Sequence, residues 1–402
     1  MKIWKRGISF FLAFVLLFSI FGIYVSADTD EDILTDTEEN PQDTSVATQP
    51  DLGLTCGAAV LMEASSGTVL YETNSADELP PASVTKIMTL LLVMEAIDAG
   101  NIQLSDPVTI SAYAASMGGS QVFLEEGEQM TVEELIKCTV IASANDAAVA
   151  LAEHLLGSET AFVDRMNQRA KELGLTNACF ENVTGLDDDT TNHVMSAMDV
   201  AVISRELIQH PLILKYSSVW MDTIRNGEFT LTNTNRLIRF YQGATGLKTG
   251  STAKAKFCIT ATAERNGMTL IAVVMAAPSR DDRNSDAKKL FDWGFSSYGV
   301  FCDKEETFEP VKVCGGTSDG VIGGHKEFTQ VLPKGKLGSV EKQVSLQASV
   351  RAPIARGTEI GTVTYLVDGE VIGTVPILAQ EEVGELGFWQ LIGRMMKIFL
   401  LS

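Results

Sequence analysis

The stretch Pro80-Pro81-Ala82-Ser83-Val84-Thr85-Lys86 decides how the rest of the chain is interpreted. Its two prolines favour an extended approach, and the apolar residues 87–97 that follow predict a buried helix that ends before Gly100. Ser83 and Lys86 are three residues apart, so they should share one face of the first helical turn. The sequence therefore predicts a hydroxyl and an amine held close together on a rigid central helix.

Two other motifs give this pair a chemical context. Ser-x-x-Lys alone is a weak signal, because the pattern occurs three more times in this chain. Ser143-Ala144-Asn145 and Lys248-Thr249-Gly250 follow it in chain order, and the three motifs together are typical of serine acyl-transfer enzymes. Without these partners, Ser143 and Asn145 would be interpreted as caps of the next helix. The combination predicts one catalytic site assembled from three segments.

The chemistry of such a site assigns a role to each side chain. A serine hydroxyl is a weak nucleophile, so a base must take its proton, and Lys86 is the candidate. Lys86 must be uncharged to act, and burial together with the positive charge of Lys248 is expected to lower its pKa. Ser143 is expected to relay the proton to the leaving group, and Asn145 to hold the substrate amide.

The third motif is expected to hold the substrate. Lys248 and Thr249 would orient the carboxylate and backbone of a bound peptide. Gly250 has no Cβ, which is expected to let a peptide lie along this strand as an added strand.

Local signals place the motifs on secondary structure. Two β-like runs at 58–63 and 68–73 predict a hairpin that leads into the Ser83 helix. A capping box at Thr131 predicts a helix over 132–141, which ends directly before the second motif. A closing helix is expected to begin at Asp282.

The N-terminus predicts export. Three cationic residues precede an apolar run at 8–25 and a small-residue site that ends at Ala27, so residues 1–27 are expected to be a secretory signal peptide. An uncleaved membrane anchor is the alternative, because the run approaches spanning length. The formal net charge of −21 becomes about −24 when these three charges are removed. Nucleic acid is therefore not an expected partner.

The rest of the chain divides into a linker, two domains and a C-terminal segment. Residues 28–50 are acidic and poor in apolar residues, which predicts a solvated, disordered linker. Residues 51–298 combine β-rich runs, notably a hairpin within 255–276, with amphipathic helices, which is typical of a catalytic α/β domain. Short alternating runs between Gly and Pro turns predict a small β-domain over 299–380. Residues 381–402 form the last predicted segment.

That last segment is expected to be an amphipathic helix on a membrane surface. Gln390, Arg394 and Lys397 fall on one stripe at helical spacing, and the other faces carry large apolar residues. The segment is too short to span a bilayer, so it should lie among the lipid headgroups. A helix packed against the protein core is the alternative.

Cysteine and histidine spacing gives no reason to expect a metal or a cofactor. The six cysteines contain no Cys-x-x-Cys pair, and the four histidines form no His-Glu-x-x-His motif. None of the histidines falls in a nucleophile elbow of the Gly-x-Ser-x-Gly kind, so neither a zinc peptidase nor a Ser-His-Asp hydrolase is supported. Cys302 and Cys314 are close enough in sequence to form a disulfide if the protein is exported.

These motifs resemble those of the serine-type D-alanyl-D-alanine carboxypeptidases, the low-molecular-weight penicillin-binding proteins. The similarity extends to the residues around the motifs, at 143–147, 246–250 and 288–294, and to the order of the predicted segments. It implies a transpeptidase domain like those of penicillin-binding proteins and β-lactamases, with an antiparallel sheet flanked by helices, followed by a small all-β domain. It also implies a peptidoglycan stem peptide as substrate, β-lactams as covalent inhibitors and a peripheral location on the outer face of the cytoplasmic membrane.

The resemblance adds two residues to the candidate site. It implies that the backbone N–H of Ser251 joins that of Ser83 in binding the oxyanion. It also implies that Arg283 binds the terminal carboxylate of the substrate. Two positions depart from the family pattern: Ser251 stands where an aromatic residue or histidine is common, and Ala255-Lys256 replaces a small Ala-Gly pair. These departures bear on substrate preference.

Two alternatives stay open at the level of sequence. A β-lactamase shares the first motifs but needs a carboxylate to activate water, and no Glu-x-x-x-Asn segment lies between Asn145 and Lys248. An inactive wall-binding scaffold would keep the fold alone, but it would have no physical need of Lys86.

Overall fold

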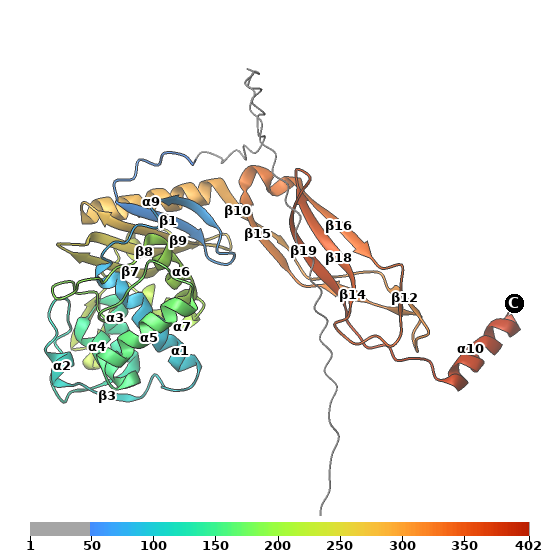
Figure 1. Ribbon diagram of the computed structural model, residues 1–402, viewed down its shortest axis with the longest axis horizontal. Helices are drawn as coiled ribbons and strands as arrows, with labels where there is room; N and C mark the ends of the chain where they lie inside the picture. The colour runs from blue at the N-terminus through green and yellow to red at the C-terminus, as the bar shows by residue number, and fades with distance from the viewer. Residues whose placement is uncertain (1–48, 402) are drawn as a thin grey trace, which may run out of the picture. The chain divides into compact units, whose positions relative to one another are not determined.

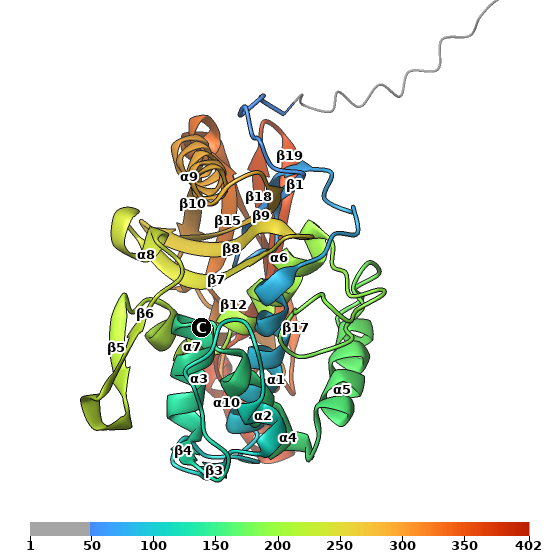
Figure 2. The same cartoon turned by 90° about the vertical axis from the view of Figure 1, so that its left-hand side faces the viewer.

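The computed structural model describes residues 49–401. The expected signal peptide and nearly all of the expected acidic linker lie outside the described residues. A five-stranded antiparallel sheet, in the order β2-β1-β9-β8-β7, forms the centre of the first domain. Its strands are β1 (Ala58–Glu63), β2 (Val69–Thr73), β7 (Ala244–Thr252), β8 (Lys256–Arg265) and β9 (Met268–Ala277). Figures 1 and 2 show this sheet with helices on both sides.

The helices come in one long insertion between β2 and β7 and one helix after β9. They are α1 (Lys86–Asp98), α2 (Ala112–Ala115), α3 (Val132–Ile141), α4 (Asn145–Leu156), α5 (Glu159–Glu172), α6 (Ala197–Ile208), α7 (Pro211–Ser217), α8 (Leu237–Phe240) and α9 (Arg280–Ser297). Two short antiparallel strand pairs lie within the insertion: β3 (Pro107–Thr109) with β4 (Gln129–Thr131), and β5 (Met221–Ile224) with β6 (Phe229–Thr232). The predicted helix at 132–141 has the expected capping box.

Alternation along β1 explains how the sheet is covered on both faces. Ala58, Val60 and Met62 pack into the core that contains α1, α3, α4 and α6. Ala59 and Leu61 point to the other face and pack into the core that contains α9. Successive residues of a strand face opposite sides of the sheet. Since both sides are covered here, the residues on both sides are apolar and the strand is buried throughout. The expected α/β class, with an antiparallel sheet flanked by helices, is confirmed.

Helix α1 lies in the middle of the first core. Ten of its thirteen residues are buried, among them Lys86 at its first position. A helix that is apolar nearly all round needs neighbours on every side, and α4, α5 and α6 supply them. The residues at its N-terminus are therefore held by the whole domain.

The second domain consists of β-strands in three sheets. Its strands are β10 (Tyr298–Asp303), β11 (Glu306–Thr307), β12 (Val311–Cys314), β13 (Gly320–Val321), β14 (Gly323–His325), β15 (Phe328–Pro333), β16 (Val340–Leu346), β17 (Ser349–Arg351), β18 (Glu359–Val367) and β19 (Glu370–Ala379). The largest sheet has the order β11-β14-β19-β18-β16, and β10 pairs with β15 in a separate sheet. A separate apolar cluster that includes Val321, Ile360 and Ile377 forms the core of this domain.

Helix α10 (Phe388–Leu401) ends the described chain. Phe388, Trp389 and Met395 are 69%, 80% and 64% exposed, so the apolar side of this helix is open to its surroundings. Arg394 forms an ion pair with Asp319, so this charge is partly engaged by the protein itself. Within the part of the chain that the structure describes, no helix is both long and apolar enough to cross a membrane.

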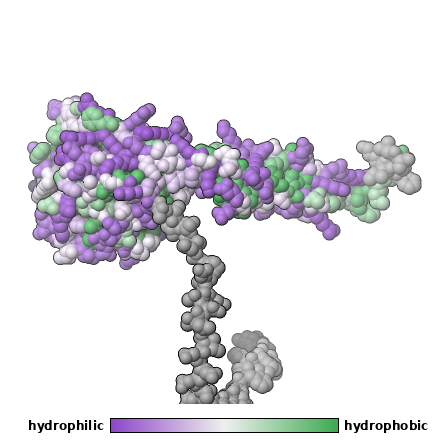
Figure 3. Space-filling model, turned by 90° about the horizontal axis from the view of Figure 1, so that it is seen from above, coloured by the Kyte–Doolittle hydropathy of each residue, from purple (hydrophilic) through white to green (hydrophobic). Residues whose placement is uncertain are grey.

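The surface of the protein agrees with its acidic composition, and its cysteines form no disulfide among the described residues. Figure 3 shows a largely hydrophilic surface with scattered hydrophobic residues, as a net charge of −21 would suggest. All six cysteines lie within the described residues and all are free. Cys302 and Cys314 are both exposed and do not form the disulfide that their spacing allowed.

Candidate active site

The turn that carries the serine differs in one detail from the expected helix start. Residues 82–85 form a short 3-10 helix, and α1 begins only at Lys86. Side chains three residues apart eclipse each other in a 3-10 helix, which brings the Nζ of Lys86 to 3.0 Å from the Oγ of Ser83. Ala82 adopts a φ of +48°, a strained value for a residue with a side chain. The tighter turn therefore improves the contact that the sequence predicted.

Lys86 is fully buried and touches three oxygen atoms. Its Nζ donates to the Oδ1 of Asn145 at 2.6 Å and to the backbone oxygen of Thr184 at 2.8 Å, in addition to its contact with Ser83. Burial holds the pKa of Lys86 well below its usual value, and the charge of Lys248 lowers it further, against an opposing effect of Asp146.

The contacts of Lys86 suit an uncharged amine. A neutral amine has two N–H groups and one lone pair. The amide oxygen of Asn145 and the carbonyl of Thr184 can only accept, so they take both N–H groups. The lone pair is then left for the O–H of Ser83, which is the arrangement of a base beside its nucleophile.

The second motif links α3 to α4. Ser143 lies in this link with a φ of +63°, again a strained conformation, and its Oγ accepts a hydrogen bond of 2.8 Å from the Nζ of Lys248. Asn145 is the first residue of α4, so Ser143 lies in the link and Asn145 does not. Its Nδ2 donates to the oxygen of Gly118 at 2.7 Å, so both ends of its amide are engaged.

Lys248 lies on the edge strand β7 and is also fully buried. Its Nζ donates to Ser143 and to the backbone oxygen of Thr249, at 2.8 Å each. Burial first, and then the charge of Arg283, lowers its pKa to about 7. The pKa values of the two motif lysines are thus lowered mainly by the same effect, because burial removes both amines from water.

The structure gives a reason for a glycine at position 250 that the sequence analysis missed. A Cβ at this position would lie 2.8 Å from the oxygen of Pro81 and 2.9 Å from the nitrogen of Ser83. These are backbone atoms and cannot move aside cheaply. The approach of the serine turn to β7 therefore explains this glycine by itself, and the expected room for a peptide stays a prediction.

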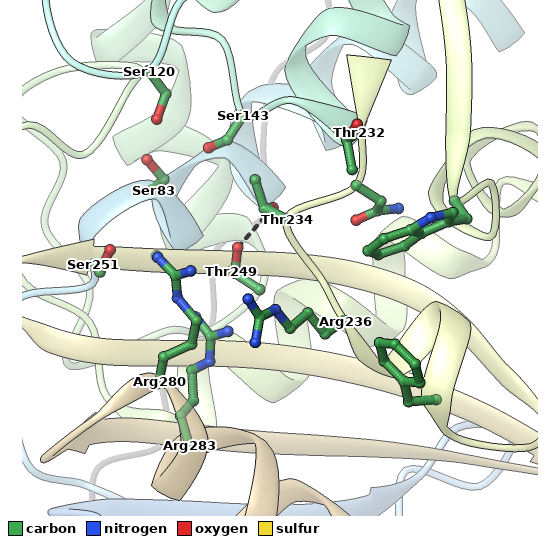
Figure 4. A pocket seen from close by; sticks show the side chains of 14 residues that line it. Ser83, Ser120, Ser143, Thr232, Thr234, Arg236, Thr249, Ser251, Arg280 and Arg283 are labelled. Atoms are coloured by element: carbon green, nitrogen blue, oxygen red, sulfur yellow. Dashed lines mark hydrogen bonds between the residues drawn. The ribbon is translucent and has the colours of Figure 1, made fainter. Parts of the chain in front are cut away.

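The three motifs line one cleft of about 570 Å³ (Figure 4). Its lining residues are Ser83, Ser120, Ser143, Trp220, Thr232, Asn233, Thr234, Arg236, Phe240, Thr249, Gly250, Ser251, Arg280 and Arg283. Lys86, Asn145 and Lys248 lie behind this lining and reach the cleft through Ser83 and Ser143. All nine candidate residues thus belong to one site.

Arg283 lies in the cleft wall with two arginines that the sequence analysis did not single out. Arg236 and Arg280 point towards the same part of the cleft in Figure 4. Arg283 is only 3% exposed, and among the described residues no carboxylate forms an ion pair with it. Burial and its arginine neighbours lower its pKa to about 10. A buried guanidinium without an acidic partner is chemically suited to an anion.

Other supporting residues also escaped prediction. Thr184, which accepts from Lys86 through its carbonyl, lies in a loop with no regular pattern. Asp146 is buried and accepts from the backbone N–H groups of Val122 and Leu124, which fixes the loop that contains Ser120. The one sequence signal for this supporting role of Asp146 was its position directly after the second motif.

Family models match both domains of the chain. Residues 43–279 match a model described as D-alanyl-D-alanine carboxypeptidase, and residues 300–385 match the C-terminal domain of penicillin-binding protein 5. D-alanyl-D-alanine carboxypeptidase DacF from Bacillus subtilis is 44% identical over 346 residues, covering 84% of this chain and 88% of its own. DacC from Escherichia coli is 34% identical over 83% of this chain and 85% of its own.

Solved structures show the same fold. Penicillin-binding protein 5 from Haemophilus influenzae has a TM-score of 0.72 and 34% identity, and the match covers 84% of this chain and 99% of that protein. Penicillin-binding protein D2 from Listeria monocytogenes, solved in an ampicillin-bound form, has a TM-score of 0.57 and 33% identity, and the match covers 61% of this chain and 100% of that protein. The fold and the assembled motifs define a serine hydrolase of the penicillin-binding-protein class.

The relatives narrow that class further. The chain belongs to the D-alanyl-D-alanine carboxypeptidase family, because the model of this family matches more than half of the chain and a member is 44% identical to it. The resemblance inferred from the three motifs is confirmed.

Proposed function

We propose that the protein removes the terminal D-alanine from peptidoglycan stem peptides through an acyl-enzyme on Ser83. The observation that carries this proposal is the contact of the fully buried Lys86 with the Oγ of Ser83 at 3.0 Å. The lowered pKa of Lys86 supports a base that is ready to accept a proton. Membership of the carboxypeptidase family supports the substrate.

The first step is the attack of Ser83 on the carbonyl of the scissile amide. Lys86 takes the hydroxyl proton as the new C–O bond forms, and the carbonyl oxygen becomes an oxyanion. The N–H groups of Ser83 and Ser251 are the proposed donors to that oxyanion. Support comes from the close approach of β7 to the serine turn at Gly250 and from the presence of both Ser83 and Ser251 in the lining of the cleft.

The second step expels D-alanine. Its amine needs a proton, and the pair formed by Ser143 and Lys248 is the proposed relay because their side chains are in hydrogen-bond contact within the cleft wall. The C–N bond breaks and leaves an ester on Ser83. The proton that Lys86 took from Ser83 is the one that this relay delivers to the amine, so Lys86 is neutral again. Water then attacks the ester, Lys86 takes a proton from the water and returns it to Ser83 Oγ as the acyl C–O bond breaks, and the enzyme is restored.

Substrate binding follows from the charges in the cleft. Thr249 and Arg283 are the proposed contacts of the terminal carboxylate, because Arg283 is buried without an acidic partner among the described residues. Asn145 would contact the substrate amide only by releasing the oxygen of Gly118, so in the resting enzyme it positions Lys86.

We also propose that the protein is exported and lies on the outer face of the cytoplasmic membrane, and that β-lactams acylate Ser83. The exposed apolar side of α10 supports membrane-surface binding. The ampicillin-bound form of a relative supports β-lactam binding.

Labelling with a fluorescent penicillin tests the proposed function. We expect covalent labelling of the full chain that disappears in Ser83→Ala. Ser339→Ala is a matched control, because Ser339 is an exposed serine in another Ser-x-x-Lys sequence and should leave labelling unchanged. Release of D-alanine from a peptide that ends in D-Ala-D-Ala should follow the same pattern. Labelling that persists in Ser83→Ala would refute the assignment.

A further inference from the structure

Three potential metal ligands meet in the second domain. They are Asp303 at the end of β10, Glu306 in β11 and His325 in β14, and their ligand atoms all lie within 4.8 Å of one another. The cluster joins two sheets, because β10 pairs with β15 while β11 and β14 belong to the five-stranded sheet. None of these residues belongs to the catalytic cleft.

The imidazole of His325 is oriented as a metal ligand. Its Nδ1 lies 2.6 Å from the backbone oxygen of Lys326, and a carbonyl can only accept, so Nδ1 carries the proton. In the neutral ring Nε2 then carries the lone pair, and it lies 3.6 Å from Asp303 Oδ2 and 3.9 Å from Glu306 Oε2. The side chain is fully buried. Histidines that bind metals usually donate their second ring N–H to a carbonyl or carboxylate in this way.

The ammonium group of Lys342 already occupies the space between the three residues of the cluster. The Nζ of Lys342 lies 2.7 Å from Asp303 Oδ2, 2.5 Å from Glu306 Oε2 and 3.5 Å from His325 Nε2. An ammonium gains little from an imidazole at 3.5 Å, which is the limit of a hydrogen bond. Displacing Lys342 breaks these two ion pairs, but a metal ion takes the same two carboxylates and adds the nitrogen of His325, which the ammonium contacts only weakly.

The distances fit a small divalent ion after a slight contraction. Zinc binds histidine nitrogen and carboxylate oxygen at about 2.0–2.2 Å, so two ligands of a tetrahedral ion lie about 3.3 Å apart. The two separations from Nε2, 3.6 and 3.9 Å, exceed this value by about 0.3 and 0.6 Å, and all three ligand atoms lie within 4.8 Å of one another, so the side chains must draw together around the ion. Tyr365 donates to Asp303 Oδ2 at 2.6 Å and would hold this carboxylate in place. A cavity of about 360 Å³ lined by Glu306 and His325 leaves room for a water as fourth ligand.

We propose that Asp303, Glu306 and His325 bind a divalent transition metal of the Zn²⁺ type, in exchange for the ammonium of Lys342. One nitrogen and two oxygen ligands suit such an ion better than Ca²⁺ or Mg²⁺, which prefer oxygen alone. Lys342 leaves as an ammonium, and its four-carbon stem lets it reach solvent. The bound ion ties β10 to β11 and β14, so its role is to stabilise the second domain.

The test titrates the metal-free full chain with Co²⁺, which gives a visible spectrum when bound in a tetrahedral site, and then displaces Co²⁺ with Zn²⁺. We expect saturation at one equivalent and a higher melting temperature with Zn²⁺. Lys342→Met removes the competing cation and should tighten binding by about tenfold or more. His325→Gln and Glu306→Gln should each weaken binding by a similar factor or abolish it. A cooperative unfolding transition of the second domain, followed by circular dichroism, shows in each variant that this domain is folded.

His210→Gln is the matched control. The Nδ1 of His210 contacts one carboxylate, that of Asp98 at 2.5 Å, but the pair has no third ligand among the described residues, so this variant should bind Co²⁺ like the wild type. The proposal is overturned if the wild type shows no saturable one-equivalent binding. It is also overturned if folded His325→Gln and Glu306→Gln both bind as tightly as the wild type.

Discussion

Replacing Lys248 by methionine should make the protein more stable while it destroys catalysis. Lys248 is fully buried and its pKa is lowered from 10.5 to about 7, mainly by burial. A tenfold weaker affinity for the proton corresponds to about 1.4 kcal/mol, so at pH 7 the folded state carries a penalty on the order of 4 kcal/mol for this one amine. Methionine has a similar length and no charge, so it removes that penalty.

Part of the gain is lost again. The amine donates to Ser143 Oγ and to the backbone oxygen of Thr249, and methionine leaves both acceptors without this donor. Unsatisfied buried acceptors cost about 1–3 kcal/mol each. Ser143 borders the cleft and can turn towards water there, so the lower part of that range applies. The expected net gain at pH 7 is about 1–2 kcal/mol.

The pH dependence separates this cause from simple repacking. Between pH 7 and 10.5 the unfolded chain holds a proton on Lys248 that the folded chain has released, so the stability of the wild type rises with pH in this window. The penalty is fully present below pH 7 and vanishes above 10.5. The advantage of Lys248→Met should therefore be largest near pH 6 and should shrink, or change sign, towards about pH 10.

Urea unfolding of wild type and variant at about pH 6, 7, 8.5 and 10 measures this difference directly. Other titrating groups are common to both proteins and cancel in the comparison. Lys248→Gln is a useful control, because it keeps a hydrogen-bond donor without the titration. A variant that is less stable than the wild type at pH 6, by an amount independent of pH, would contradict the reasoning.

Three further predictions concern the base, the glycine and the C-terminal helix. Lys86→Arg keeps a charge but cannot deprotonate, so penicillin acylation should fall by several orders of magnitude; a near-normal rate would mean that another group is the base. Gly250→Ala places a Cβ against backbone atoms of the serine turn, so we expect a loss of stability of about 1–3 kcal/mol and slower acylation, measured by urea unfolding and labelling. Deletion of residues 384–402 should release an active enzyme from vesicles of anionic phospholipid, and truncated protein that still sediments with the vesicles would exclude the helix as the anchor.

Much of the fold could be predicted because its signals are local. The capping box at Thr131 and the apolar run after Lys86 each determine a helix within a few residues, and α3 has the predicted bounds. Seven of the nine candidate site residues could be found because the three motifs are short and contiguous, and Ser251 and Arg283 came from the resemblance to the family. The start of α1 was misplaced by one turn, because a 3-10 turn and an α-helical turn have the same sequence signals.

What escaped prediction depends on contacts between distant segments. Thr184 supplies only its backbone oxygen, which any residue could do, so its identity carries no signal. Arg236 lies in a loop and reaches the cleft only because α8 and β7 are neighbours. The cluster around His325 unites β10, β11 and β14, and no metal-binding spacing exists in the sequence when each ligand comes from a different strand.

The catalytic site is best understood as a coupled pair of lysines. Lys86 must be neutral to act as a base, and the charge of Lys248 is one of the causes that keep it so. Lys248 in turn loses its proton more readily because Arg283 lies near it. In the mechanism proposed above, the carboxylate of a substrate beside Arg283 and Thr249 would offset that repulsion and favour the charged form of Lys248. Under this proposal, binding of the correct end of the substrate would keep Lys86 neutral when Ser83 attacks, so recognition of the carboxylate and activation of the serine would be one electrostatic event.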